Sequence, residues 1–224
     1  MNREAVCGRS KRCWYVCVLP ALMGHGGCAG AQSALDPAGS GAARISVLFW
    51  QMTVGSAVIW LAVVGLALYA TYKKSPPERT RHGHWLIVGG GVIAPTVVLA
   101  GLLIYGLAML PPLLAAAPPG SLRVQVSGEQ YWWRVRYPGP NGETVELANE
   151  LRLPVGEATQ LELTSPDVIH SFWIPSLGGK VDMIPGRTTQ LALHPTRTAE
   201  LSGACAEFCG TSHAHMGFKA VVLE

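Results

Sequence analysis

The residues best suited to carry out chemistry lie close together near the end of the sequence. The stretch CAEFCGTSHAHM, residues 205–216, contains Cys205, Cys209, His213 and Met216, with His215 as a further candidate. Thiolate, imidazole and thioether groups form a soft ligand set, which suits copper far better than calcium or magnesium. The stretch therefore predicts a copper site.

Two other interpretations of this stretch stay open on spacing alone. The first is a structural zinc site, although zinc rarely recruits methionine and its cysteines more often follow a C-x-x-C spacing. The second is a disulfide between Cys205 and Cys209, which so short a loop would strain unless the backbone adapted to it. Copper remains the favoured interpretation.

A copper site of this kind needs a histidine from elsewhere in the chain. A mononuclear blue-copper site uses one thiolate and a second, upstream histidine, whereas two thiolates here could bridge two copper ions. His170, in SPDVIHSFWIP, is the best upstream candidate because it stands at a strand-to-loop junction among apolar residues. His194 lies in a polar turn and is weaker. A histidine in an apolar run is more often a core residue, but the neighbouring ligand set favours His170.

The elements that must position these residues are short β-strands. From residue 121 to 224 the sequence consists of short alternating runs separated by Gly, Pro and Asn turns. The runs lie at 122–126, 131–137, 160–164, 189–193 and 220–223, and PGPNGE at 138–143 is a strong hairpin signal. This pattern predicts an antiparallel β sandwich or barrel. No Gly-rich phosphate loop occurs, which argues against a nucleotide enzyme.

The preceding part of the chain is suited to lipid. The whole sequence is 49% apolar and 14% charged, which is too apolar for one ordinary soluble domain. Residues 45–72 and 85–117 contain no charged side chain, whereas a bilayer requires about 20 such residues. We therefore expect two transmembrane helices, 45–72 and 85–110, the second ended by prolines. The basic loop 73–84 between them is expected on the cytoplasmic side.

The N-terminal segment has the layout of a secretory signal peptide. Basic residues precede a short apolar run, and small residues follow it up to Cys28. We expect a signal peptide over 1–28, of the lipoprotein type if Cys28 is lipidated, and then a flexible linker over 29–44. Because four of the six cysteines fall before residue 29, they do not form the framework of a disulfide-rich secreted domain.

The net charge of +3 is unevenly divided along the chain. The first 120 residues carry nine Lys/Arg against three Asp/Glu, and the remainder eight against eleven. The basic charge therefore belongs to membrane orientation. The mildly acidic C-terminal part argues against a nucleic-acid partner and is compatible with a basic protein partner.

Taken together, these segments resemble subunit II of haem-copper cytochrome c oxidases. The family pattern C-x-E-x-C-x-x-x-H-x-x-M is matched by Cys205, Glu207, Cys209, His213 and Met216. DVIHSFWIPSLGGKVDMIPGR at 167–187 looks like the family segment that carries the first histidine, and GEQYWWRVRY at 128–137 is similar to the region where electrons enter. The resemblance covers residues 45–224 and implies a cupredoxin-like Greek-key β sandwich behind a two-helix membrane anchor.

The resemblance also implies a role for each matched residue. Cys205 and Cys209 would bridge the two coppers of a Cu-A centre, His170 and His213 would each cap one copper, and Met216 would be a weak ligand. The Glu207 backbone carbonyl would complete the ligand set, and its carboxylate would face a magnesium ion shared with the catalytic subunit. Electrons would enter through Tyr131, Trp132 and Trp133.

The implied function is that of a respiratory electron carrier. The copper centre would accept electrons from cytochrome c and pass them to haem in subunit I, where oxygen is reduced to water and protons are pumped. The chain would not reduce oxygen alone. It would reside in a bacterial plasma membrane with the copper domain on the periplasmic side. No C-x-x-C-H occurs, so the cytochrome donor is expected to be a separate protein.

The sequence departs from the family pattern at two places. The aromatic region has Gln130 followed by Tyr131, where the family usually has tryptophan. The start of the second helix lacks the glutamate of many relatives, and only His82 and His84 titrate near neutral pH there. Two alternatives are a quinol-oxidase subunit without copper, which the retained ligands argue against, and a membrane-anchored copper carrier or assembly factor.

Overall fold

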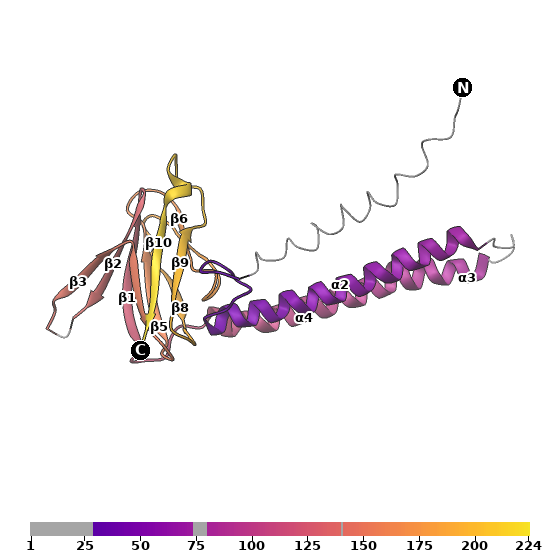
Figure 1. Ribbon diagram of the computed structural model, residues 1–224, viewed down its shortest axis with the longest axis horizontal. Coiled ribbons are helices and arrows are strands. Elements are labelled where there is room, and N and C mark those ends of the chain that lie inside the picture. Colours follow the sequence, from indigo (N-terminus) through magenta and orange to yellow (C-terminus); the bar gives the residue numbers. More distant parts are fainter. Residues whose placement is uncertain (1–28, 74–79, 140) are drawn as a thin grey trace, which may run out of the picture.

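The computed structural model describes residues 29–73, 80–139 and 141–224. Within these ranges a pair of long helical spans is joined to a β sandwich (Figure 1). The expected signal peptide at 1–28, with Cys28, lies outside the described residues, as do residues 74–79 of the basic loop. The side chain of His82 also lies outside the described part.

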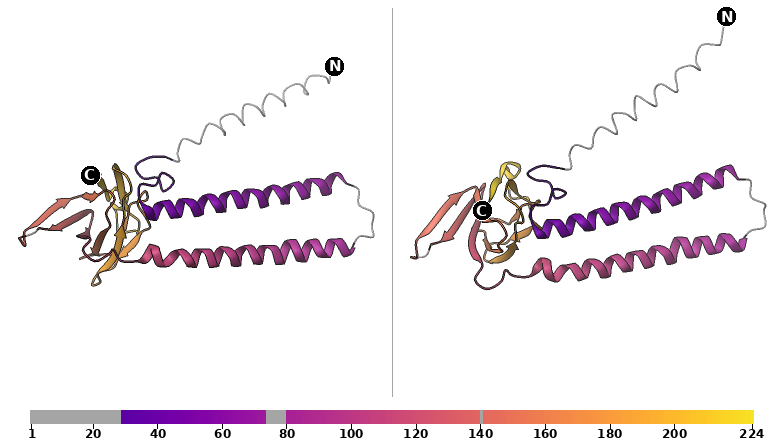
Figure 2. Two further views of the ribbon diagram at one scale, coloured as in Figure 1. Left: turned by 90° about the horizontal axis from the view of Figure 1, so that it is seen from below. Right: turned by 60° about the horizontal axis from the view of Figure 1, so that its bottom comes forward.

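Two helical spans leave the sandwich in the same direction and run side by side (Figure 2). Both are long and apolar enough to cross a membrane. The first is one helix; the second consists of three consecutive helical segments, of which the middle one is π-helical and contains three glycines. Their bounds are α2 Ser40–Tyr72, α3 Thr80–Trp85, η2 Leu86–Ile93 and α4 Ala94–Leu114.

The prolines expected to end the second span lie inside its helix. α4 continues through Pro111 and Pro112 and ends at Leu114, four residues beyond the expected boundary. Proline holds φ near −65°, which is a helical value, and its missing N–H removes one backbone hydrogen bond. Because both prolines lie in the last turns, the helix keeps its path and ends only when Ala115 becomes extended.

The sandwich consists of two five-stranded sheets. One has the order β3-β2-β1-β5-β8 and the other β4-β10-β9-β6-β7, so the chain passes between the sheets repeatedly. This confirms the expected cupredoxin-like Greek-key sandwich behind a two-helix hairpin. The strands are β1 Leu122–Glu129, β2 Trp132–Pro138, β3 Thr144–Ala148, β4 Glu150–Pro154, β5 Thr159–Thr164, β6 His170–Trp173, β7 Val181–Met183, β8 Thr189–Leu193, β9 Ala199–Cys205 and β10 Gly217–Leu223.

The expectation of a purely antiparallel sandwich was wrong at two pairings. β1 pairs with β5 in parallel, from Leu122↔Thr159 to Ser127↔Thr164, and β10 pairs with β4 in parallel. Parallel neighbours need a long crossover connection. Here β2 to β4 lie between β1 and β5 in the sequence, and β5 to β9 lie between β4 and β10. A pattern of alternating residues reports strands but not their relative direction.

The core fills the space between the two sheets. Val124, Val126 and Trp133 of one sheet face Phe172 and Phe218 of the other, and all five are buried. The rings of Phe172 and Phe218 stack at 4.9 Å, and Trp133 meets Phe172 edge-on at 5.6 Å. This aromatic group lies at the end of the sandwich where β6 and β10 begin and β9 ends, and it fixes those strand ends relative to one another.

The segment before α2 is attached to the sandwich. The backbone of Ala38 donates to Ser176 O at 2.7 Å and accepts from Thr196 N at 2.8 Å, and Ser202 N donates to Ala31 O at 2.9 Å. Arg197 forms an ion pair with Asp36 at 3.0 Å. The expected flexible linker over 29–44 therefore differs from the structure, because backbone groups of β9 and of the loop after β6 bind it.

Candidate metal centre

The loop between β9 and β10 forms the upper end of the sandwich in Figure 1 and carries most of the candidate ligands. Its two ends are joined by Cys205 N, which donates to Met216 O at 3.0 Å. Between them a short 3-10 turn, η3 His213–His215, begins where His213 N donates to Gly210 O at 3.1 Å. The loop thus returns on itself and brings both cysteines beside His213 and Met216.

The two thiols lie at the centre of a compact donor cluster. Cys205 Sγ and Cys209 Sγ are 3.8 Å apart, and both cysteines are free. In the structure they are therefore not joined as a disulfide, which is one of the alternatives that the sequence leaves open. Together with His170 they form a group whose ligand atoms all lie within 4.8 Å of one another. This trio could hold a metal ion.

Each sulfur has its own set of further donor atoms. Cys205 Sγ lies 3.8 Å from His170 Nδ1 and 3.2 Å from the carbonyl oxygen of Glu207. Cys209 Sγ lies 3.5 Å from His213 Nδ1 and 3.7 Å from Met216 Sδ. All six sequence-predicted copper ligands are thus brought together around one pair of sulfurs.

Burial of this cluster is nearly complete. His170 is fully buried, Cys205, Cys209 and Met216 are buried, and His213 is half-buried. Burial, reinforced by the neighbouring Cys205, raises the pKa of the Cys209 thiol to about 11. The thiol is therefore protonated at neutral pH without a cation, and a bound metal would replace that proton.

His170 is held at its second ring nitrogen. Its Nε2 lies 2.8 Å from Asp167 Oδ1, while Nδ1 faces the sulfurs. Burial acts to raise the pKa of Asp167, but hydrogen bonds from Gln130 N, Val168 N and His170 outweigh it and lower this pKa below its usual value. Asp167 therefore stays a carboxylate and accepts a hydrogen bond from the Nε2–H group of His170.

The three aromatic candidates occupy different environments. Trp133 is fully buried, and its Nε1 donates to Met216 O at 3.3 Å, so it offers no surface to a donor protein. Trp132 is half-buried, with the Arg134 guanidinium 4.6 Å from its ring centre. Tyr131 is half-buried and contacts the metal loop, since its hydroxyl lies 3.2 Å from Thr211 Oγ1 and accepts from Thr211 N at 3.2 Å.

Gly210 makes that contact possible. It has φ +130°, which side chains rarely tolerate, and a Cβ there would collide with the Tyr131 hydroxyl. The aromatic segment and the metal loop are thus in direct contact one residue after Cys209. A position that needs glycine beside a ligand cannot be inferred from ligand spacing.

The Glu207 side chain is 47% exposed, and its carboxylate forms an ion pair with the Lys180 ammonium at 3.9 Å. Lys180 also contacts Asp182 at 4.0 Å and donates to Ala206 O at 3.4 Å. The carboxylate is therefore available to a ligand outside the sandwich, although a lysine already partners it.

The weaker histidine candidates lie outside the cluster. His194 follows β8 beside the start of α2, where its carbonyl accepts from Ser40 N. The strand registers place this position at the opposite end of the sandwich, because Leu193 and Leu122 both pair with Thr159, whereas Gly128 at the far end of β1 contacts His170. His215 is exposed on η3.

Two supporting residues have no place in the sequence-predicted ligand set. Gln130 Nε2 donates to Cys209 O at 2.6 Å, and Asp167 holds His170. The spacing D-x-x-H is a usable signal for the second, because a histidine ligand usually donates its other N–H to a carboxylate or carbonyl. No local signal links Gln130 to Cys209, which lies 79 residues away.

Comparisons with known proteins point to one family. A family model described as "Cytochrome C oxidase subunit II, periplasmic domain" matches residues 140–223. A cytochrome c oxidase subunit 2 of Vanderwaltozyma polyspora is 31% identical over 203 residues, covering 80% of this chain and 80% of the relative. The corresponding protein of Alkalihalophilus pseudofirmus is 32% identical over 211 residues, covering 88% of this chain and 61% of the relative.

A further relative, an alternative cytochrome c oxidase subunit 2 of Bradyrhizobium diazoefficiens, is 29% identical, covering 65% of this chain and 60% of the relative. The chain thus spans about 60% of the length of the two bacterial relatives. Among solved structures, the periplasmic domain of subunit II of cytochrome oxidase (CoxB) of Bradyrhizobium japonicum is 32% identical, covering 48% of this chain and 88% of that one, with a TM-score of 0.45.

Proposed function

Since this chain belongs to the cytochrome c oxidase subunit 2 family, we propose that its Cys/His cluster is the dinuclear copper centre through which electrons enter a haem-copper oxidase. The observation that carries the proposal is the convergence of four further donors, two imidazole nitrogens, a thioether and a carbonyl oxygen, on two sulfurs 3.8 Å apart. Two free thiols at this separation are suited to bridging two soft cations.

The donor set fits copper by its chemistry. Cys205 and Cys209 would be the bridging thiolates, His170 and His213 the imidazole ligands, and Met216 with the Glu207 carbonyl the weak ligands. Copper supplies a one-electron acceptor and donor when bound. Zinc has no redox chemistry and seldom uses a thioether, so the Met216 sulfur 3.7 Å from Cys209 Sγ favours copper over a structural zinc site.

The chain contributes rigidity and a dry environment. The ligands come from two segments, β6 and the β9–β10 loop, which are joined by Ala206 N donating to Ser171 O at 2.9 Å. The buried rings of Trp133, Phe172 and Phe218 pack beneath them. Such a frame limits movement between oxidation states, which is the condition for rapid electron transfer.

Electrons would enter beside the aromatic segment. Tyr131 is the better candidate for the donor-facing ring, because its hydroxyl touches the loop that holds Cys209 and His213. Trp132 is the second candidate, and Trp133 is excluded by its burial. The expected donor is a cytochrome c, and the expected acceptor is haem in subunit I, which would reduce oxygen and pump protons.

The Glu207 carboxylate would face a magnesium ion at the boundary with the catalytic subunit. Its exposure supports this role, and carboxylate oxygen is the ligand that magnesium prefers. Lys180 would release the carboxylate when that ion binds.

The membrane arrangement follows from charge. Lys73, Lys74, Arg79 and Arg81 lie in the basic segment 73–84 between the two apolar stretches, and short basic loops face the cytoplasm. The sandwich at the other end of both helices would then stand on the outer, periplasmic face of a bacterial plasma membrane.

A copper carrier or assembly factor is the alternative class, because it would use the same soft ligands. Burial of the cluster argues against it, since a carrier must surrender its metal quickly. We expect the copper-loaded full chain to take up one electron per pair of coppers from reduced cytochrome c and to keep its copper during hours of competition with a chelator. Rapid loss to the chelator would favour the carrier, and a chain that binds no copper would favour a quinol oxidase.

A further inference from the structure

Two residues outside the ligand set connect the segments that bear the ligands. Asp167 lies in the loop before β6, and Gln130 lies between β1 and β2. The Asp167 carboxylate accepts from Gln130 N at 2.7 Å through Oδ2 and lies 2.8 Å from His170 Nε2 through Oδ1. A single side chain thus contacts both a ligand histidine and the start of the aromatic segment.

Gln130 extends this connection to the other ligand segment. Its side-chain amide donates to Cys209 O at 2.6 Å. The path His170–Asp167–Gln130–Cys209 therefore runs without interruption from the histidine of β6 to a cysteine of the β9–β10 loop. It joins the two segments by side chains, in addition to the backbone bond at Ala206.

Two further residues lie beside the His170 ring. Gly128 lies against one face, where a Cβ would approach the ring carbons to 3.1 Å, and the Trp133 ring lies 6.3 Å away, centre to centre. Because the ring is fully buried, its orientation depends on these contacts and on Asp167. A carboxylate can only accept, so Nε2 carries the proton and the lone pair of Nδ1 faces the sulfurs.

The Asp167 carboxylate is itself fixed by short local bonds. Val168 N donates to Oδ1 at 2.6 Å, and Ser165 Oγ, which donates its one proton to Val168 O at 2.5 Å, lies 3.2 Å from Oδ1. With Gln130 N and His170 Nε2, three donors converge on one carboxylate whose side chain is 29% exposed. Such saturation exceeds what a surface carboxylate needs for solubility and is typical of a residue that orients a neighbour.

We propose that Asp167 and Gln130 form a clasp that positions His170 and the Cys209 peptide before copper binds. Both are positioning residues, since neither contacts the donor side of the cluster. This inference rests on the proposed copper site for its consequence, but the clasp itself belongs to the metal-free chain. Removing either residue leaves the six ligands in the sequence and loosens the geometry in which they meet.

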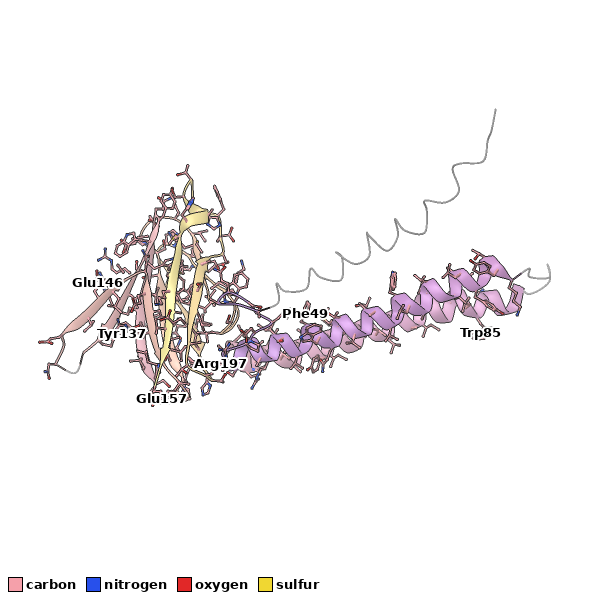
Figure 3. The ribbon with its side chains drawn as sticks, in the orientation of Figure 1. Phe49, Trp85, Tyr137, Glu146, Glu157 and Arg197 are labelled. Atoms are coloured by element: carbon pink, nitrogen blue, oxygen red, sulfur yellow. The ribbon has the colours of Figure 1, made fainter. Side chains whose placement is uncertain are left out.

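The first test uses the metal-free full chain in detergent. In Asp167→Ala the amides of Gln130 and Val168 lose their acceptor, and we expect their hydrogen exchange to accelerate at least about tenfold, as measured by NMR. The matched control is Glu157→Ala, which removes a carboxylate in the turn at the opposite end of the sandwich (Figure 3). Unchanged exchange in Asp167→Ala overturns the clasp, whatever the chain does with copper.

The second test measures copper affinity by chelator competition, together with the reduction potential. We expect Asp167→Ala and Gln130→Ala each to weaken copper binding about 10- to 100-fold, the range for groups that orient metal ligands. The double variant should be little weaker than either single one, because both residues belong to one path. Fully additive losses, or single losses below twofold, contradict the clasp.

A conservative variant separates orientation from general stability. Asp167→Asn keeps an oxygen for His170 but presents an amide to Gln130 N, so we expect an affinity between those of wild type and Asp167→Ala. We also expect the reduction potential to rise in Asp167→Asn and Asp167→Ala, because both remove negative charge beside a ligand imidazole, and to change little in Gln130→Ala. An equal shift in all three would indicate a merely structural effect and overturn the assignment.

Discussion

The end of the sandwich that carries the Cys/His cluster, called the metal end below, and the two helical spans differ in how their side chains are held in place. At the metal end, His170 and Met216 are almost wholly enclosed, and each contacts a distant segment, His170 at Cys205 and Met216 at Trp133. Along the helical spans, α2 buries only Ala42 and Ser46, both at its sandwich end, and α4 buries no side chain. Phe49 and Trp85 lie along these spans in Figure 3.

This contrast shows where each region obtains its stability. An exposed apolar helix needs lipid or other helices around it, because it has no core of its own to join. At the metal end all six candidate ligands and the groups that contact them belong to this chain, so their geometry does not depend on a partner protein. Substitutions at the metal end should therefore change metal binding or the stability of the sandwich core. Substitutions in the spans should change insertion into the membrane.

The largest expected effect is at the sulfur pair. Cys209→Ser should abolish the dinuclear copper spectrum while the sandwich still folds, because serine keeps the shape and loses the bridging thiolate. Visible absorption after copper loading is the measurement, with Ser212→Ala in the same loop as the control. Unchanged absorption in Cys209→Ser would rule out a bridging role.

Next in size is the core beneath the cluster. Trp133→Ala should destabilise the sandwich by about 3–5 kcal/mol, because a fully buried tryptophan leaves a cavity. Trp132→Ala, one residue away on the half-buried face, should cost only about 1 kcal/mol. Denaturant unfolding of the detergent-solubilised chain measures both losses of stability, with hydrogen exchange in peptides from the strands as the signal. Equal losses would refute the assignment of the two rings to different faces.

A charge in the middle of a span tests the other region. Leu103→Arg, at a position 63% exposed on α4, should cost about 2.5–3.5 kcal/mol of membrane insertion. Leu103→Ala is the control. Insertion assays in microsomes or inverted vesicles report the inserted fraction. A normal inserted fraction for Leu103→Arg would contradict a lipid environment for this span.

A smaller effect is expected where the aromatic segment meets the metal loop. Tyr131→Phe removes the hydroxyl that contacts Thr211 and should cost about 1 kcal/mol of stability. Tyr131→Ala should also slow electron uptake from reduced cytochrome c without loss of copper. Stopped-flow reduction at matched copper content measures this rate, and full-speed uptake in both Tyr131→Ala and Trp132→Ala would refute the proposed route.

The smallest effect concerns a surface ion-pair group. The hydrogen bond from Arg134 lowers the pKa of Glu129. A lowered folded-state pKa contributes stability above the unfolded-state value, and this contribution disappears as the pH falls through the folded-state pKa. Glu129→Gln, which removes the charge and keeps the shape of the side chain, should therefore lower Tm slightly at pH 7 and have no such effect once the pH falls below the folded-state pKa of Glu129. A Tm difference that persists unchanged in acid would contradict this origin.

Sequence reasoning could identify the ligand loop because all its donors are close in the chain. Cys205, Cys209, His213 and Met216 lie within twelve consecutive residues, so their types and spacing together indicate a site for a soft metal. The identification of His170 as a candidate ligand depended on its apolar surroundings in the sequence and on the family resemblance. The hairpin at 138–143 followed from its turn residues, and it joins β2 to β3 as expected.

Other features depend on contacts that no local pattern records. The parallel pairing of β1 with β5 arises from the path of the whole chain. The attachment of residues 31–42 uses mostly backbone groups, which every residue has, so an Ala/Gly/Ser composition concealed it. Likewise, the alternation at Tyr131, Trp132 and Trp133 predicted a strand, but only the structure distinguished the buried ring from the two half-buried ones.

The central claim is that one pair of sulfurs holds two copper ions in this chain. The most direct measurement is the copper content of the loaded full chain, together with its electron paramagnetic resonance spectrum. The account predicts two coppers per chain and one unpaired electron coupled equally to two copper nuclei. A content of one copper per chain, with hyperfine coupling to a single nucleus, would contradict it.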